Sequence, residues 1–312
     1  MARTIVLLGP QRLHPILVTA FDELGLEGPI ATVTAGWQER EAEVEEMREH
    51  LGRPVVNLRL YARAEQLFGD DPKLAQLYHQ RQERLRDLQE LYRLRLADAL
   101  RTARELARKQ GVEPSLIEPE RQAAIDAVRQ LDAHHLERIR GIHEDFDAAA
   151  RPFDRPALLR LRTAMAKELA GTTALAIAGG HVAVLLNRLR LFGVLDLAPR
   201  HPVFAWSAGA MALGPRVVLF HDNPPQGPGD AEVLERGLGL FDDVLALPHA
   251  SKRLALEDPV LVALFARRFA PLTAVAFDPK TRLVRRAGGN WKPLPETRRL
   301  SEDGAVVAIT ER

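Results

Sequence analysis

Short apolar runs that alternate with helical patterns set the strongest limit on how this chain can fold. TIVLLGP (4–10), PIATVTAG (29–36) and PVVNLRL (54–60) each have the length and apolar content of a buried strand. Stretches in which apolar residues recur three or four positions apart separate these runs. Because strands that alternate with helices imply parallel pairing, the pattern predicts an α/β fold with a mostly parallel sheet and helices on its faces.

Residues 70–150 interrupt this alternation with a segment of a different kind. The segment is dense in Arg, Glu, Leu, Gln and Ala and has few β-branched residues. Its apolar residues keep the spacing of one helix face, and Gly111 and Pro114 divide the pattern in two. The segment therefore predicts a long antiparallel α-helical hairpin inserted into the α/β domain, and a shorter helix at about 155–170 returns the chain to the core.

The α/β pattern resumes after the insertion. The strand-like runs are ALAIAGG (174–180), PVFAW (202–206), RVVLFHD (216–222), DDVLALPH (242–249), TAVAFDP (273–279) and GAVVAIT (304–310). We therefore predict one α/β domain made of residues 1–68 and 170–312, with residues 70–168 as the helical insertion.

Composition limits the classes of function. The chain has 312 residues, a net charge of +1 and no cysteine, which excludes disulfides and a thiolate nucleophile. Arginines of the first insertion helix interleave with acidic residues, so we predict no nucleic-acid partner. The amino-terminal apolar run is too short to span a membrane, so we predict no membrane partner and expect a cytoplasmic protein.

Histidines and carboxylates gather on the second insertion helix. They are Asp132, His134, His135, Glu137, His143, Glu144 and Asp145. Such residues can bind zinc, but their spacing matches no known ligand pattern. We therefore predict no metal and no cofactor.

FAWSAGAMALG (204–214) has a serine at the point where a predicted strand becomes a helix. A tight strand-to-helix turn exposes such a hydroxyl at the carboxyl edge of the sheet, beside the first N–H groups of the helix. The usual pattern of this turn is Gly-x-Ser-x-Gly, and here Ala205 takes the place of the first glycine. We predict that Ser207 is a catalytic nucleophile.

A nucleophilic serine needs a base that removes its proton and an acid that orients the base. His249 follows an apolar strand, and we expect it at the same edge of the sheet as Ser207. His221 is the alternative candidate for the base. For the acid we favour Asp222. Three other candidates stay open, namely Asp242, Asp243 and Asp278.

An oxyanion hole needs two preorganised N–H donors. Ala208 follows the nucleophile, and the double glycine 179–180 ends an earlier strand. Because glycine allows a backbone that turns its N–H toward a ligand, we predict Gly180 and Ala208 as the donors.

Four segments in this order resemble the dipeptidase E and cyanophycinase family of serine peptidases. They are AIAGGHVAVLLNRLRLFG, VFAWSAGAMALG, FHDNPP and GLGLFDDVLALPHASKR. The resemblance covers residues 1–68 and 172–285. It implies the flavodoxin-like three-layer sandwich of class I glutamine amidotransferases, with serine in place of the cysteine nucleophile. It further implies cleavage of a peptide bond beside an aspartyl residue, with Ser207 as nucleophile, His249 as base and Asp222 as acid.

The sequence departs from the family pattern next to the expected substrate. His181 follows the double glycine, where the family usually has a small polar residue, and we predict that His181 contacts substrate. Arg253 matches the first of two family arginines and is also predicted to bind substrate, whereas Ala255 stands in place of the second. Pro279 replaces the glutamate of the cyanophycinase branch.

The sequence thus predicts a serine hydrolase that acts on a small peptide or amino-acid-derived substrate. The alternative is a catalytically inactive scaffold that binds a small molecule or a protein partner through the hairpin. The role of the hairpin stays open between a lid, a docking element and a homodimer interface.

Overall fold

The computed structural model describes residues 3–221 and 229–310. Its main sheet has seven strands in the order β11-β10-β1-β5-β4-β2-β3. The five strands from β1 to β3 in this order are parallel, and β10 and β11 extend the sheet with antiparallel pairing. The strands are β1 (Ile5–Leu8), β2 (Ile30–Val33), β3 (Val55–Asn57), β4 (Ala174–Ile177), β5 (Val203–Trp206), β10 (Arg282–Arg285) and β11 (Trp291–Pro293).

Helices cover both faces of this sheet because strand side chains alternate between the faces. Ile5 and Leu7 pack into one apolar cluster with α3, α7 and α9, and Val6 and Leu8 pack into a second cluster with α1 and α2. The layers confirm the predicted α/β sandwich. The helices are α1 (Leu17–Asp22), η1 (Ala35–Arg40), α2 (Glu45–Leu51), α3 (Leu60–Asp70), α7 (Val182–Phe192), α8 (Val194–Leu197) and α9 (Ala208–Leu213).

A second, four-stranded sheet has the order β13-β12-β9-β8, and β6 and β7 form a separate two-stranded ribbon. Strand β8, which leads to His249, therefore lies outside the main sheet, and the expectation that it shares the sheet of Ser207 is wrong. Among the described residues, the strand that pairs with β8 is β9. Helix α9, which follows Ser207, packs against β8. These strands are β6 (Arg216–His221), β7 (Gly229–Arg236), β8 (Val244–Pro248), β9 (Thr273–Phe277), β12 (Arg298–Leu300) and β13 (Val306–Ala308), joined by α10 (Ala250–Arg253) and α11 (Pro259–Phe269).

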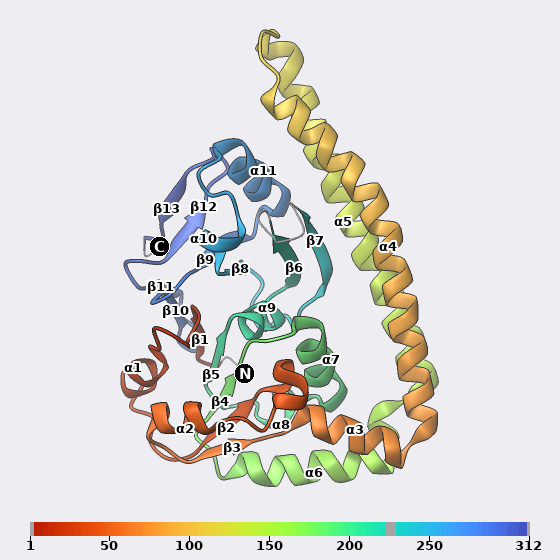
Figure 1. Cartoon of the computed structure of the whole chain (residues 1–312), viewed down its shortest axis with the longest axis vertical. Helices are drawn as coiled ribbons and strands as arrows, with labels where there is room; N and C mark the ends of the chain where they lie inside the picture. The colour runs from red at the N-terminus through yellow and green to blue at the C-terminus, as the bar shows by residue number, and fades with distance from the viewer. Residues whose placement is uncertain (1–2, 222–228, 311–312) are drawn as a thin grey trace.

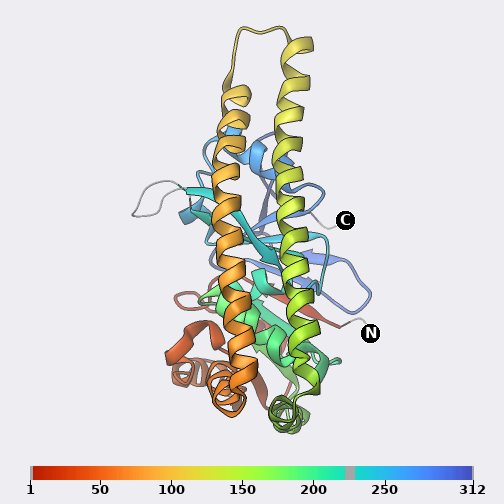
Figure 2. The ribbon, with the colours of Figure 1, turned by 90° about the vertical axis from the view of Figure 1, so that its right-hand side faces the viewer.

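The insertion forms the predicted helical hairpin. Its arms are α4 (Pro72–Arg108) and α5 (Pro114–Ala150), and η2 (Pro152–Asp154) and α6 (Pro156–Ala170) return the chain to the sheet. Each arm has 37 residues and is therefore about 55 Å long. The hairpin runs along one side of the molecule, and its tip extends past α11 (Figures 1 and 2). The exact boundaries of the insertion stay a prediction.

A buried ion pair fastens the hairpin to the α/β domain. Asp132 of α5 and Arg268 of α11 are 0 % and 4 % exposed, and Nε of Arg268 donates to Oδ2 of Asp132 over 2.8 Å. Tyr92 of α4 donates to Asp132 over 2.7 Å, and Arg268 also donates to the Ala231 carbonyl of β7 over 2.6 Å. His135 stacks on Tyr92, and burial lowers its pKa to about 4. Part of the charge-rich pattern on α5 is therefore a buried network that joins α4, α5, β7 and α11.

Among the described residues, none of the helices has both the length and the apolar composition needed to cross a membrane.

We expect Arg268→Met to lower the free energy of unfolding by about 3–5 kcal/mol, because it leaves the Asp132 carboxylate buried without its partner. The double variant Arg268→Met/Asp132→Leu should recover much of this loss, since no buried charge remains. Urea unfolding followed by circular dichroism measures both. Asp98→Asn, which breaks the exposed pair with Arg101, is the control and should cost less than about 1 kcal/mol. A loss in Arg268→Met no larger than in this control would contradict the role of the buried ion pair in fastening the hairpin.

Candidate active site

Ser207 occupies a strained backbone conformation between β5 and α9. Its φ of 50° and ψ of −124° lie in a region that residues with a side chain rarely adopt. Strand β5 ends at Trp206 and α9 begins at Ala208, so the predicted strand-to-helix turn is present. The turn presents Ser207 at the carboxyl edge of the parallel sheet, and its side chain is partly exposed.

Glycines surround the turn because the backbones approach too closely for side chains. A Cβ at Gly179 would lie 2.7 Å from the Cβ of Ser207. A Cβ at Gly209 would lie 2.4 Å from the carbonyl oxygen of Ile177. Ala205 replaces the first glycine of the usual pattern and is completely buried within β5, where the sheet accommodates its methyl group. The small residues of the motif are therefore required by the contact between β4 and β5.

His249 follows β8 and has a left-handed backbone with φ 57° and ψ 35°. Its N–H donates to the carbonyl of Phe277 over 2.9 Å, and Pro248 pairs with Phe277 in the parallel β8–β9 ladder. His249 follows Pro248 and Asp278 follows Phe277, so His249 lies beside Asp278.

Gly9 brings the main sheet into contact with the four-stranded sheet beside Asp278. Leu8 pairs with Trp206, so Gly9 follows β1 opposite Ser207. A Cβ at Gly9 would lie 1.9 Å from the backbone oxygen of Asp278. The ends of β1 and β9 therefore meet, with Ser207 at the end of the strand beside β1 and His249 at the end of the strand beside β9. No hydrogen bond joins their side chains in the described part of the chain, and catalytic hydrogen bonds often tighten only when substrate is bound.

The four candidate acids lie in different places. Asp222 falls outside the described residues. Asp242 and Asp243 precede β8, and its five residues separate them from His249 by about 17 Å. Asp243 instead accepts a hydrogen bond from the Trp291 indole over 2.9 Å.

Asp278 is the described candidate that lies beside His249. It is buried, and its Oδ1 accepts from the N–H and hydroxyl of Ser251 over 3.0 Å and 2.8 Å. Its Oδ2 is buried and has no hydrogen-bond partner within the residues described, although Arg298 lies 3.6 Å away. A buried carboxylate oxygen without a hydrogen bond is an available acceptor for an imidazole N–H.

Burial lowers the pKa of His249 below its ordinary value of 6.5. The positive charges of Arg253 and Lys252 lower the pKa further, whereas Asp278 raises it. The imidazole is therefore neutral at pH 7 and able to accept a proton.

The predicted oxyanion donors belong to the turns after β4 and β5. Gly180 has a φ of 107°, and a Cβ there would lie 2.3 Å from the carbonyl oxygen of Gly36. Ala208 is the first residue of α9. Within residues 3–221 and 229–310, neither N–H donates to an acceptor in the protein. Two N–H groups without partners beside a nucleophile fit an oxyanion hole.

The two predicted substrate residues differ in their surroundings. His181 is exposed and caps α7, since its Nδ1 accepts from the N–H of Val184 over 3.3 Å. Arg253 ends α10 and is partly buried, with its guanidinium 6.0 Å from the centre of the Phe220 ring. Burial lowers the pKa of Arg253. His181 thus has a structural role in capping, and substrate contact by either residue stays a prediction.

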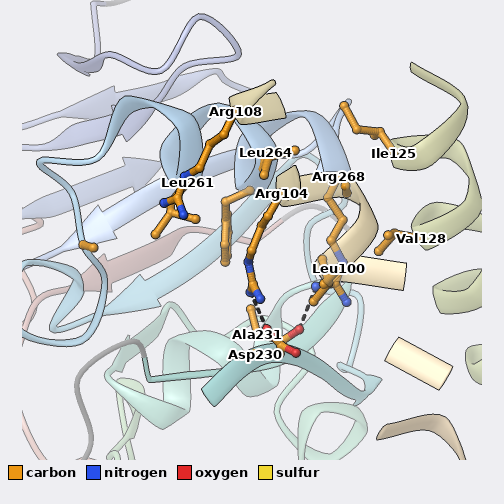
Figure 3. A pocket seen from close by; sticks show the side chains of 13 residues that line it. Leu100, Arg104, Arg108, Ile125, Val128, Asp230, Ala231, Leu261, Leu264 and Arg268 are labelled. Carbon is orange, nitrogen blue, oxygen red and sulfur yellow. Dashed lines mark hydrogen bonds and ion pairs between the residues drawn. The ribbon is translucent and has the colours of Figure 1, made fainter. Parts of the chain in front are cut away.

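A cavity in the described residues lies away from this site. It has a volume of about 440 Å³ and lies between the hairpin, β7 and α11 (Figure 3). Its arginines Arg104, Arg108 and Arg268 pair with Asp230, Asp258 and Asp132, so they serve to fasten the hairpin. None of the residues predicted to act in catalysis lines this cavity. The described residues also contain no group of three or more His, Cys, Asp or Glu side chains that could hold a metal ion.

Two residues near the site were missed by sequence reasoning. The sequence predicts no role for Gly9 beyond the end of the strand-like run TIVLLGP, whereas the structure shows a close backbone approach there. Gln38 follows β2 and shares the backbone conformation of Ser207. No sequence signal could have identified Gln38, because residue type does not reveal a strained φ and ψ.

No protein-family model and no curated protein matches the sequence. The structure is similar to a solved peptidase from an acI-B1 Actinobacterium, with a TM-score of 0.49 and 13 % identity over 99 % of this chain and 98 % of that chain. It is also similar to the "Putative Peptidase E Protein from Listeria monocytogenes EGD-e", with a TM-score of 0.42 and 11 % identity over 96 % of this chain and 100 % of that chain. At such low similarity the activity has to be inferred from the site itself.

We expect the pKa of His249 to lie below 6.5 and to rise in Arg253→Gln, because removal of a nearby positive charge favours the imidazolium. The pKa should stay below 6.5, since burial is the larger cause. An NMR titration, with the signal assigned through His249→Gln, measures both. Arg285→Gln is the control, because Arg285 pairs with Asp243 before the other end of β8. A wild-type pKa at or above 6.5, or no rise in Arg253→Gln, would count against this view of the site.

Proposed function

We propose that the protein is a serine hydrolase that cleaves the amide bond of a small peptide through an acyl-enzyme. The observation that carries the proposal is the conformation of Ser207, strained and pressed against Gly179 at the start of α9. Strain of this kind persists only where the surrounding structure enforces it, and it is concentrated at functional sites.

The reaction follows from the positions of the neighbouring groups. Ser207 Oγ attacks the substrate carbonyl while His249 accepts the hydroxyl proton. The N–H groups of Gly180 and Ala208 stabilise the oxyanion of the tetrahedral intermediate. His249 then gives the proton to the leaving amine, and water hydrolyses the acyl-enzyme by the same steps in reverse.

Asp278 is the acid that we assign to this triad. In support of this assignment, Asp278 follows β9 beside His249, its charge raises the pKa of that imidazole, and one of its oxygens is buried without a hydrogen bond among the described residues. Asp222, favoured by the sequence, remains the competing candidate.

The substrate that we propose is a small peptide with an aspartyl residue beside the scissile bond. The family resemblance suggests this class, and the partly buried Arg253, four residues after His249, is suited to bind a carboxylate. A cytoplasmic location belongs to the same proposal.

A non-catalytic scaffold is the second candidate function. It is favoured by one observation, namely that the described residues contain no hydrogen bond between Ser207 and His249. The labelling experiment below separates the two functions, because a scaffold has no activated serine.

We expect a fluorophosphonate probe to label the wild type and Ser251→Ala, and not Ser207→Ala, because only Ser207 lies beside the oxyanion donors. Ser251 is a stringent control, since it hydrogen bonds to Asp278 close to the site. Intact-mass spectrometry counts the adducts. Labelling of Ser207→Ala, or of no variant, would reject Ser207 as the nucleophile.

We expect Asp278→Asn to lower kcat by roughly 10²–10⁴-fold, because the amide cannot stabilise the imidazolium that forms during attack. Asp243→Asn, at the far end of β8, should change kcat less than about twofold. Hydrolysis of a dipeptide library that includes Asp-X compounds provides the measurement. Unchanged kcat in Asp278→Asn together with a large loss in Asp222→Asn would assign the acid to Asp222 instead.

A further inference from the structure

Gln38 repeats the backbone conformation of the nucleophile. Its φ of 58° and ψ of −124° match the 50° and −124° of Ser207. These angles are those of the first central residue of a type II′ turn, where glycine is usual. Arg59, Arg151 and His249 also have positive φ, but they adopt the milder left-handed helical region.

The turn that contains Gln38 is in backbone contact with the oxyanion turn. A Cβ at Gly36 would lie 2.4 Å from the Gly179 carbonyl oxygen, and the N–H of His181 donates to the Gly36 carbonyl over 2.7 Å. Gly179 in turn touches Ser207. Unbroken backbone contact therefore connects the nucleophile to Gly36, two residues before Gln38.

Gln38 follows β2, which is separated from β5 by β4 in the main sheet. Val33 pairs with Ile177, and Ile177 pairs with Ala205, so the ends of β2 and β5 are roughly 10 Å apart. The oxyanion turn lies between them. A substrate group that is bound by residues after β2 would therefore belong to the acyl part of the substrate, beyond the scissile carbonyl.

Hydrogen bonds on both sides hold Gln38 in this conformation. The N–H of Trp37 donates to Thr34 over 2.8 Å, and the N–H of Glu41 donates to the Gln38 carbonyl over 2.9 Å. The buried Glu41 carboxylate accepts from the N–H of Tyr61 over 2.9 Å. The turn is thus fixed by its surroundings, as expected where strain is retained for a purpose.

The Gln38 amide is available for a ligand. Its side chain is partly buried, and the described residues contain no hydrogen bond to it. The neighbouring Glu39, by contrast, accepts a hydrogen bond from Tyr61 over 2.8 Å. An amide offers one acceptor oxygen and two N–H donors. This set fits an ammonium or peptide N–H together with a carbonyl or carboxylate oxygen.

From these observations we propose that Gln38 binds the acyl side of the peptide substrate, with Oε1 accepting from its amino group or peptide N–H and Nε2 donating to an oxygen. The proposal rests on the proposed hydrolase function. It makes Gln38 a residue that distinguishes peptides from simple acyl compounds, since an acetyl group has nothing beyond the carbonyl for the amide to bind.

Gln38→Gly tests the proposal, because glycine keeps the turn, relieves its strain and removes the side chain that carries the amide. We expect kcat/KM for Asp-X dipeptides to fall about tenfold, the effect of one lost hydrogen bond of about 1.4 kcal/mol, and mainly through KM. Hydrolysis of p-nitrophenyl acetate should change less than about twofold, and the melting temperature should not fall. Arg59→Gly is the matched control, because it removes an exposed side chain at positive φ after β3, at the edge of the sheet. Both activities should stay at the wild-type level in this control.

The outcomes distinguish the two claims. Wild-type protein that hydrolyses neither compound and takes no fluorophosphonate label overturns the hydrolase function, and the role of Gln38 with it. An active wild type whose dipeptide kinetics are unchanged in Gln38→Gly overturns the role of Gln38 alone. An equal loss on dipeptides and p-nitrophenyl acetate would also overturn it, because that result indicates a disturbed oxyanion turn.

Discussion

The close backbone contact between the turns after β4 and β5 is the constraint on which the site depends. A Cβ at Gly179 would lie 2.7 Å from the Cβ of Ser207, and only glycine satisfies such a distance. The same contact lets the N–H groups of Gly180 and Ala208 lie on one side of the nucleophile. Gly36 extends the contact by one more strand, to the turn of Gln38. The carboxyl edge of the sheet is therefore a continuous row of backbone turns that hold polar groups with little freedom.

The second constraint is the contact between two sheets. His249 and Asp278 belong to the four-stranded sheet, whereas Ser207 belongs to the main sheet. Gly9 brings them together, because its lack of a side chain allows β1 to approach the backbone of Asp278. The hairpin is fastened to the same half of the molecule through Arg268 of α11 and the β6–β7 ribbon. A movement of the hairpin would act first on these elements, and α10 and α11 follow His249 directly in the chain.

The features of this fold that depend on local sequence pattern were predicted correctly. The alternation of strands and helices, the turn at Ser207 and the long hairpin are all visible as runs and spacings. The neighbourhood of His249 was less accessible, because the pairing of β8 with β9 depends on contacts between segments about 30 residues apart. For that reason Asp278 stayed one candidate among four. Asp132 and His135 were weighed from the sequence only as zinc ligands, whereas Arg268, 136 residues from Asp132 along the chain, makes them part of a buried network. Gln38 gave no signal at all, because strain is a property of backbone angles.

A crystal structure of the protein after reaction with a fluorophosphonate would test the central claim most directly. We expect a phosphonyl group on Ser207 Oγ. One phosphonyl oxygen should lie within about 3.1 Å of both the Gly180 and Ala208 nitrogens. An imidazole nitrogen of His249 should lie on the opposite side of the phosphonyl group. A phosphonyl oxygen directed to solvent, with Gly180 and Ala208 turned away from it, would contradict the account.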